Sequence, residues 1–115
     1  MLTGALIGLI SAAHADVRWI AAQVLAGRTG ADVTRALIVL ADDDDADVRR
    51  AAADALARRD GTEVTSTLLT LLRDQRSYVR SAAMQALASR NDPAILERIC
   101  TRRIHLSPIR KKRTP

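Results

Sequence analysis

The chain has 115 residues, of which 48% are hydrophobic but only 2% aromatic. Because its core must be built from small aliphatic side chains, the composition favours thin layers of closely packed helices over a thick globular interior. The net charge is +5, but the positive charge is concentrated in residues 98–115, which hold seven basic and no acidic side chains. Residues 1–97 carry a net charge of −2, which excludes a uniformly basic domain. A single cysteine and two histidines exclude an internal disulfide and a zinc-binding set, and we expect a protein of a reducing compartment, the cytoplasm.

The first fifteen residues are apolar, and the sequence AHA at 13–15 resembles the cleavage site of a secretory signal. A signal would carry Lys or Arg before its apolar run, whereas the first basic residue here is Arg18. The aliphatic pattern instead recurs 31 residues later, where Leu6, Ile7 and Leu9 correspond to Leu37, Ile38 and Leu40. We therefore predict the first helix of an array, too short and Gly-interrupted to span a membrane.

The rest of the chain is predicted to form pairs of helices, each with a helix A followed by a helix B. The predicted spans are 2–12 and 16–26, 32–41 and 47–59, and 63–73 and 77–89. A seventh helix is expected from Pro93 to about Ile104, and residues 105–115 form a basic tail. The predicted repeats cover residues 1–29, 30–60, 61–91 and, in part, 92–104.

One motif organises these pairs. The sequence VRxxAxxxLA begins at Val17, Val48 and Val79, with a spacing of 31 residues. Such a period is typical of a repeated helix-turn-helix unit, and we predict an all-α solenoid of about three pairs.

Each helix carries one apolar stripe at helical spacing. In helix B the stripe of the middle repeat is Val48, Ala51, Ala52, Ala55 and Leu56. In helix A it is Val33, Leu37, Ile38 and Leu40, repeated as Val64, Leu68, Leu69 and Leu71. A single pair cannot cover both stripes, so we expect each pair to be stabilised by its neighbours.

Two pairs have an aspartate six residues before an arginine, namely Asp43 before Arg49 and Asp74 before Arg80. We expect the carboxylate at the end of helix A to lie near the guanidinium at the start of helix B. The arginine can then bridge it with two hydrogen bonds while also reaching the next repeat. Ala12 replaces the acid in the first pair, so the ladder is predicted to be broken there.

Three longer segments carry a family resemblance. The sequences ADVRWIAAQVLAGRTGADV, ADVRRAAADALARRDGTEV and SYVRSAAMQALASRNDPAI resemble HEAT repeats, specifically the short bacterial type named after phycobilisome lyases. The resemblance covers about residues 1–104 and implies a right-handed, armadillo-like α-solenoid that binds other proteins along the concave face made by helix B. It also implies a ladder between repeats for Asp43, Arg49, Asp74 and Arg80.

Some branches of that family are enzymes, but the residues that their chemistry needs are missing here. Iron-binding deoxyhypusine hydroxylases use repeated His-Glu pairs, whereas neither His14 nor His105 is followed by Glu. Chromophore lyases usually use much longer arrays, and repair glycosylases need a larger basic cleft with aromatic residues. We expect a non-catalytic protein without cofactor or metal that enters no membrane.

The positions of helix B that face away from the apolar stripe form three columns. Seven of their residues are predicted to contact a protein partner of unknown identity: Trp19, Gln23, Arg50, Asp54, Ser81, Met84 and Gln85. One column is Trp19, Arg50 and Ser81, the second is Gln23, Asp54 and Gln85, and the third is Ala22, Ala53 and Met84. Trp and Arg are enriched at binding hot spots. The alternative is that Trp19 packs over the N-terminal edge and Arg50 is only solvated.

The run of four aspartates at 42–45 could suggest calcium, but the alternating ligands, central Gly and distant Glu of an EF-hand are missing. We expect it to cap the following helix, where negative charge lies near the positive end of the helix.

The basic C-terminal segment predicts a second possible function, contact with nucleic acid. Its residues are Arg98, Arg102, Arg103, Arg110, Lys111, Lys112 and Arg113. Such a cluster can bind phosphates in a salt-dependent way. The alternative is a solvating cap for the last repeat.

The N-terminal end is unlike a cap, because residues 2–13 contain no charged side chain. We expect this helix to be covered by a second copy of the chain, another protein or an upstream repeat.

Overall fold

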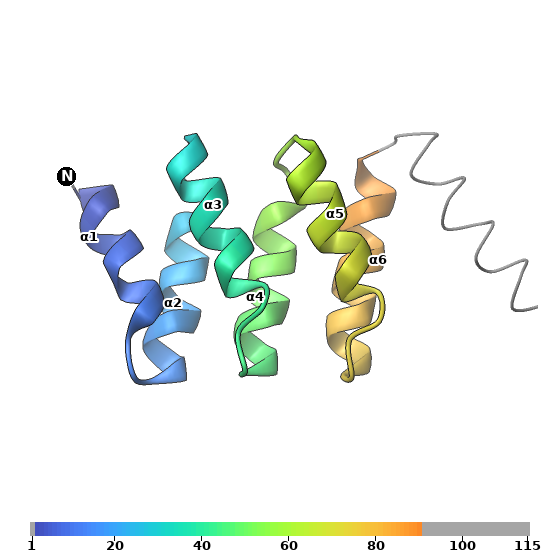
Figure 1. Ribbon diagram of the computed structural model, residues 1–115, viewed down its shortest axis with the longest axis horizontal. Helices are drawn as coiled ribbons and strands as arrows, with labels where there is room; N and C mark the ends of the chain where they lie inside the picture. The colour runs from blue at the N-terminus through green and yellow to red at the C-terminus, as the bar shows by residue number, and fades with distance from the viewer. Residues whose placement is uncertain (1, 91–115) are drawn as a thin grey trace, which may run out of the picture.

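The computed structural model describes residues 2–90, with side chains from residue 4 onward. The predicted seventh helix, Cys100 and the basic tail lie outside the described residues. Six α-helices follow one another: α1 (Leu2–Gly8), α2 (Ala15–Leu25), α3 (Ala31–Leu40), α4 (Ala46–Leu56), α5 (Thr62–Leu71) and α6 (Ser77–Ser89). Figure 1 shows them as two layers, with α1, α3 and α5 in front of α2, α4 and α6. The described part of the chain is therefore the predicted all-α solenoid.

Two helices end at least three residues earlier than predicted. The first was expected to reach residue 12, but α1 ends at Gly8 and a 3-10 turn, Leu9–Ser11, completes the segment. Glycine weakens a helix because its backbone loses more conformational freedom than that of other residues. Helix α4 was expected to reach residue 59 but ends at Leu56, because the chain turns there toward Gly61 and the next helix.

Gly30 and Gly61 begin the second and third pairs in a backbone conformation that only glycine adopts readily. Their φ angles are 115° and 123°, with ψ near 150°. An L-residue with a Cβ atom would be strained there. The recurrence of glycine at this position of the repeat thus follows from the geometry of the turn into helix A.

The core is a seam of aliphatic side chains that runs through all three pairs. The complete predicted stripe of α4 is buried, with Val48, Ala52 and Leu56 at 0% exposure. In α3 and α5 the stripes are also buried, except that Ile38 and Leu69 are only partly so and pack against the edge of the seam. The prediction that neighbouring pairs share one aliphatic core is confirmed.

The two layers are not packed alike. Helices α2, α4 and α6 contact each other extensively, whereas α1, α3 and α5 make few contacts with one another. The alanines of helix B allow the close approach, since a small side chain keeps helix axes near each other. The layer of α2, α4 and α6 is therefore the more closely packed of the two.

Candidate functional site

The exposed side of α2, α4 and α6 is the candidate partner-binding face; we call it the B face. Six of the seven predicted contact residues are exposed on it: Trp19, Gln23, Arg50, Asp54, Ser81 and Gln85. Trp19 is 42% exposed, which is unusual for so large an apolar side chain. The structure thus brings two of the three predicted columns to the surface.

The third column was placed wrongly. Ala22 and Ala53 are completely buried, and Met84 is partly buried against the core. The reason is that a B helix packs against a neighbouring B helix as well as against helix A. These three positions contribute to packing more than to the exposed face.

The B face also includes Tyr78, which the sequence reasoning missed. This residue lies in the first turn of α6 and is 41% exposed. It precedes Ser81 by three residues and Gln85 by seven, a spacing that places all three on one side of a helix. That spacing was the available signal, and it extends the column at the C-terminal end of the face.

Arg50 and Asp54 form an ion pair in the middle of the B face. Their closest atoms, Arg50 Nε and Asp54 Oδ2, are 3.9 Å apart, and both side chains are 57% exposed. Such an exposed pair at i, i+4 contributes little to stability. Both groups remain available to a partner, and their charges balance.

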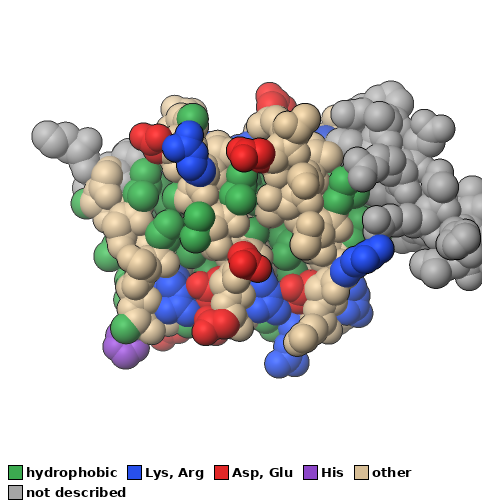
Figure 2. Space-filling model, viewed as in Figure 1, with side chains coloured by type: hydrophobic (Ala, Val, Ile, Leu, Met, Phe, Trp, Pro, Cys, Tyr) green, Lys and Arg blue, Asp and Glu red, His purple; other side chains and the backbone are tan. Residues whose placement is uncertain are grey.

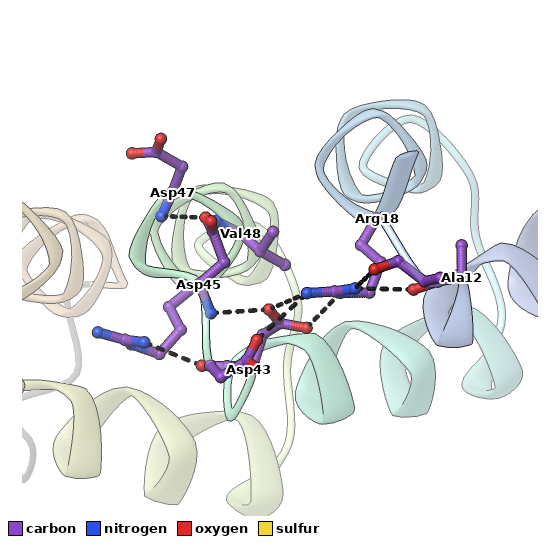
Figure 3. Close-up of polar contacts among 9 residues, drawn as sticks. Ala12, Arg18, Asp43, Asp45, Asp47 and Val48 are labelled. Atoms are coloured by element: carbon purple, nitrogen blue, oxygen red, sulfur yellow. Dashed lines mark hydrogen bonds and ion pairs between the residues drawn. The ribbon is translucent and has the colours of Figure 1, made fainter. Parts of the chain in front are cut away.

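A ladder of arginine and aspartate side chains joins the repeats at the start of helix B. Arg18 donates two hydrogen bonds to the Asp43 carboxylate, from Nε to Oδ1 at 2.8 Å and from Nη2 to Oδ2 at 3.1 Å. Arg49 holds Asp74 in the same way, at 2.7 and 3.1 Å. Figure 3 shows the first rung, and Figure 2 shows basic and acidic side chains alternating along the lower edge of the molecule.

The pairing within each repeat was predicted incorrectly. The arginine reaches the carboxylate of the next repeat, and within its own repeat it meets a backbone carbonyl. Arg49 Nη1 donates to the Asp43 carbonyl at 2.9 Å, and Arg80 Nη1 donates to the Asp74 carbonyl at 2.6 Å. Geometry explains this, because the carbonyl already fills the near side of the guanidinium and leaves its fork directed at the neighbouring repeat.

The predicted break at the N-terminal end is also wrong. Arg18 Nη1 donates to the Ala12 carbonyl at 2.7 Å, so Ala12 supplies the same backbone acceptor as Asp43 and Asp74 do. Arg18 therefore belongs to the ladder, although the sequence analysis left it out. A carboxylate at position 12 would bind only the arginine of a preceding repeat, as Asp43 binds Arg18.

The ladder lowers the pKa values of its two aspartates, Asp43 and Asp74. Burial raises the pKa of Asp43, but hydrogen bonds from Arg18 and from the Asp45 backbone N–H outweigh this and hold the pKa below its ordinary value. Burial likewise raises the pKa of Asp74, and Arg49 together with the Arg76 backbone N–H reverses the effect, so the net pKa is lowered. Both rungs are therefore stronger with ionised carboxylates.

A second set of contacts between repeats lies at the other end of helix B, at the arginines spaced by 31. Arg59 Nη2 donates to the carbonyls of Arg28 and, at 3.2 Å, Leu25, while its Nη1 donates to Thr34 Oγ1 at 2.9 Å. Arg90 donates in turn to the Arg59 carbonyl. A cation at these carbonyls is favourable because they lie at the negative end of a helix. Each B helix is thus tied to the next at both ends.

The aspartate run acts through its individual members. Asp45 caps α4 and accepts hydrogen bonds from the backbone N–H groups of Asp47 and Val48 at 2.9 and 3.2 Å. Capping is the role that was predicted for the run, and Asp43 adds the rung to Arg18. Within residues 2–90, no group of three or more His, Cys, Asp and Glu side chains could hold a metal ion.

The predicted nucleic-acid-binding residues, Arg98, Arg102, Arg103, Arg110, Lys111, Lys112 and Arg113, lie outside the described residues. In the part of the chain that the structure describes, no helix is both long and apolar enough to cross a membrane.

A family model for HEAT repeats matches residues 3–99. No curated protein matches the chain. The finer assignment to the phycobilisome-lyase type stays a prediction.

Proposed function

The chain belongs to the HEAT-repeat family, and we propose that it is a non-catalytic interaction or scaffold module that binds a partner protein along its B face. HEAT repeats commonly serve as scaffolds for protein interaction, and the B layer is the more closely packed layer of this stack. A cytoplasmic location, expected from the single cysteine, is part of the same proposal.

The observation that carries the proposal is the exposed aromatic and charged set on the B face. Trp19 and Tyr78 are each about two-fifths exposed, and Arg50 lies between their helices on α4. Large rigid aromatics and arginine supply much of the binding energy in protein interfaces. Gln23, Ser81 and Gln85 add uncharged hydrogen-bonding groups around them.

The ladders support this function by fixing the face before a partner arrives. Arg18 and Arg49 join the N-terminal ends of successive B helices, and Arg59 and Arg90 join their C-terminal ends. The spacing of the exposed side chains is then held by the scaffold. A preorganised surface loses less conformational entropy on binding than a mobile one does.

Charge favours a protein over a nucleic acid as the partner of this face. Residues 2–90 hold 11 basic and 11 acidic side chains, so this part of the chain has no net charge. Four of those arginines are already held in the two ladders. A surface that binds the phosphate backbone needs an excess of accessible positive charge.

Affinity capture from the source cell tests the proposal with four forms of the full chain. The wild type is compared with Trp19→Ala and Arg50→Ala on the B face, and with Arg35→Ala, which changes an exposed arginine on the opposite layer. We expect the same protein to be retained by the wild type and by Arg35→Ala, and to be lost or strongly reduced with both B-face variants. All samples are run with and without nuclease.

Two outcomes would contradict the proposal. Retention that is equal for all four forms would show that the B face is not the contact surface. Retention that disappears with nuclease would favour nucleic acid, and deletion of residues 105–115 would then test the basic tail. Because Trp19 is the only tryptophan, its emission provides a direct check with the purified partner.

A further inference from the structure

The arginine–aspartate ladder contains a third arginine that has no aspartate at the matching position. Arg18 and Arg49 each hold the aspartate 25 residues later, and their side chains are only 12% and 15% exposed. Arg80 occupies the same place in the third repeat but is exposed. The residue 25 positions after Arg80 is His105, which lies outside the described residues. The sequence therefore has no aspartate at the position that would complete a third rung.

Arg80 is nevertheless held in the orientation of an arginine that binds a carboxylate. Its Nη1 donates to the carbonyls of Asp74 and Gln75 at 2.6 and 3.2 Å. In Arg18 the same nitrogen donates to the two equivalent carbonyls at 2.7 and 3.2 Å, while Nε and Nη2 hold the carboxylate of Asp43. Among the residues that the structure describes, Nε and Nη2 of Arg80 have no hydrogen-bond partner. These two donors are therefore oriented but unpaired within that part of the chain.

The geometry of these two donors matches a carboxylate. Nε and Nη2 donate in parallel from one plane, so they can bind both oxygens of a carboxylate at once. The molecule contains this pairing twice, at 2.8 and 3.1 Å in the rung of Arg18 and at 2.7 and 3.1 Å in that of Arg49. Figure 3 shows how the site at Arg18 is filled. Because two carbonyls already fix Arg80, a carboxylate that binds there has little side-chain freedom left to remove.

The surroundings of Arg80 also favour a negatively charged ligand. Arg73 and Arg76 lie in the loop between α5 and α6, and both are exposed. The acid of the same loop, Asp74, is already bound by Arg49. At the positions of Arg73 and Arg76 the preceding repeat has aspartates, so the charge of the loop is reversed here. Figure 2 shows basic side chains at the right-hand end of the lower edge, and three exposed arginines create an excess of positive charge in this loop and the first turn of α6.

We propose that Arg80, flanked by Arg73 and Arg76, is a binding site for an acidic segment of a partner protein. Nε and Nη2 of Arg80 hold one aspartate or glutamate carboxylate of the segment, and the two flanking arginines attract its neighbouring carboxylates. The ligand takes the place that the aspartate of the following repeat takes in the two complete rungs. The inference rests on the ladder and does not depend on binding at the B face.

Fluorescence anisotropy with the full chain tests this site. The probe is a labelled hexapeptide of aspartate with both termini blocked, and the matched probe is the same peptide made of asparagine. We expect the aspartate peptide to bind and the asparagine peptide not to bind. Arg80→Gln should weaken the binding by at least about 5-fold, because a charge-assisted contact with two hydrogen bonds is lost. Arg80→Lys should weaken it similarly, since lysine keeps the charge but lacks the planar pair of donors.

The controls separate this site from the other charged parts of the chain. An acidic peptide also meets the basic tail, so all variants are compared in chains that carry it. Arg35→Gln removes an exposed arginine of α3, and Trp19→Ala changes the B face; both should bind the peptide as the wild type does. In NMR spectra the Nε–Hε resonance of Arg80 should shift on titration with the aspartate peptide, whereas that of Arg49, which is already paired, should not. Circular dichroism melts show which variants remain folded.

Four results would overturn the inference. The first is a wild type that does not bind the aspartate peptide, or a folded Arg80→Gln variant that binds it equally well. The second is undiminished binding by Arg80→Lys, which would indicate attraction by charge alone. The third is a shift of the Arg80 resonance in the free chain on Asp92→Asn or Glu97→Gln, which would show that an acid of the chain itself is bound there. The fourth is binding of a thymidine oligonucleotide that depends on Arg80 and is tighter than that of the peptide, which would assign the site to nucleic acid.

Discussion

The rung between Arg49 and Asp74 offers the sharpest test of how the repeats are joined. Two hydrogen bonds of 2.7 and 3.1 Å connect the groups, and their side chains are only 15% and 7% exposed. Asp74→Ala removes both bonds and also the acceptor for the Arg76 backbone N–H at 2.9 Å. Removal of one partner from a largely buried pair costs up to about 3–5 kcal/mol.

We expect Asp74→Ala to reduce stability by somewhat less than that upper value. Arg49 keeps its bond to the Asp43 carbonyl and retains some contact with water, so we expect Asp74→Ala to lower the free energy of unfolding by about 2–4 kcal/mol. Urea unfolding gives this value. A double-mutant cycle with Arg49→Ala should give a coupling energy of about 1–3 kcal/mol.

The chain supplies two controls for this cycle. The exposed pair Arg50 and Asp54, with its 3.9 Å separation, should couple by less than about 0.5 kcal/mol. The cycle of Arg49 with Asp43 should give less than that of Arg49 with Asp74, because Asp43 meets this arginine through its backbone. Equal coupling of Arg49 to both aspartates, or coupling no larger than that of the exposed pair, would refute the ladder between repeats.

Leu56→Ala empties a fully buried site and should cost about 2–5 kcal/mol in urea unfolding; a loss below about 1 kcal/mol would contradict the shared seam. The lowered pKa values of Asp43 and Asp74 predict a dependence on acid. Their stabilisation is complete above the ordinary aspartate pKa of about 3.9 and is lost as the pH falls through the folded-state pKa. Urea midpoints should therefore fall more steeply with acid in the wild type than in Asp74→Asn, and parallel curves would be inconsistent with this cause. Gly61→Ala should cost about 1–3 kcal/mol because its φ of 123° strains any residue with a Cβ atom, whereas Gly27→Ala should change the thermal midpoint little.

The helices and the core could be predicted because one period of 31 residues repeats both the apolar spacing and the turns. Val48, Ala52 and Leu56 lie at intervals of four residues, and such a stripe has only one way to be buried. Helix ends were less predictable, as at Gly8, where a 3-10 turn replaces the last turn of the expected helix. At a helix end a local turn and one further helical hydrogen bond are close alternatives.

The ladder shows what the sequence leaves ambiguous. Asp43 lies six residues before Arg49 and 25 residues after Arg18, and both separations are compatible with contact in a repeat array. Only the packing of successive pairs decides between them, and it selects Arg18. A repeat spacing thus identifies which residues take part more readily than it identifies which repeat supplies each partner.

The B face was predicted only in part for a related reason. A helical projection treats one helix alone, and on it Ala22 and Ala53 face away from the apolar stripe. In the stack these alanines pack against the shared core and are buried, while Trp19 and Gln23 remain exposed. The exposure of Ile20 and Val24 depends likewise on their place at the edge of the array and not on their own helix.

Site-specific photo-cross-linking tests the central claim, recognition by the B face, most directly. A photoreactive residue is placed at Gln23, Asp54 or Gln85 on the B face, and at Arg35 or Val39 on the opposite layer, all of which are exposed. The account predicts that one partner protein is cross-linked from the three B-face positions and from neither control position. Cross-linking from Arg35 and Val39, with none from α2, α4 and α6, would contradict it.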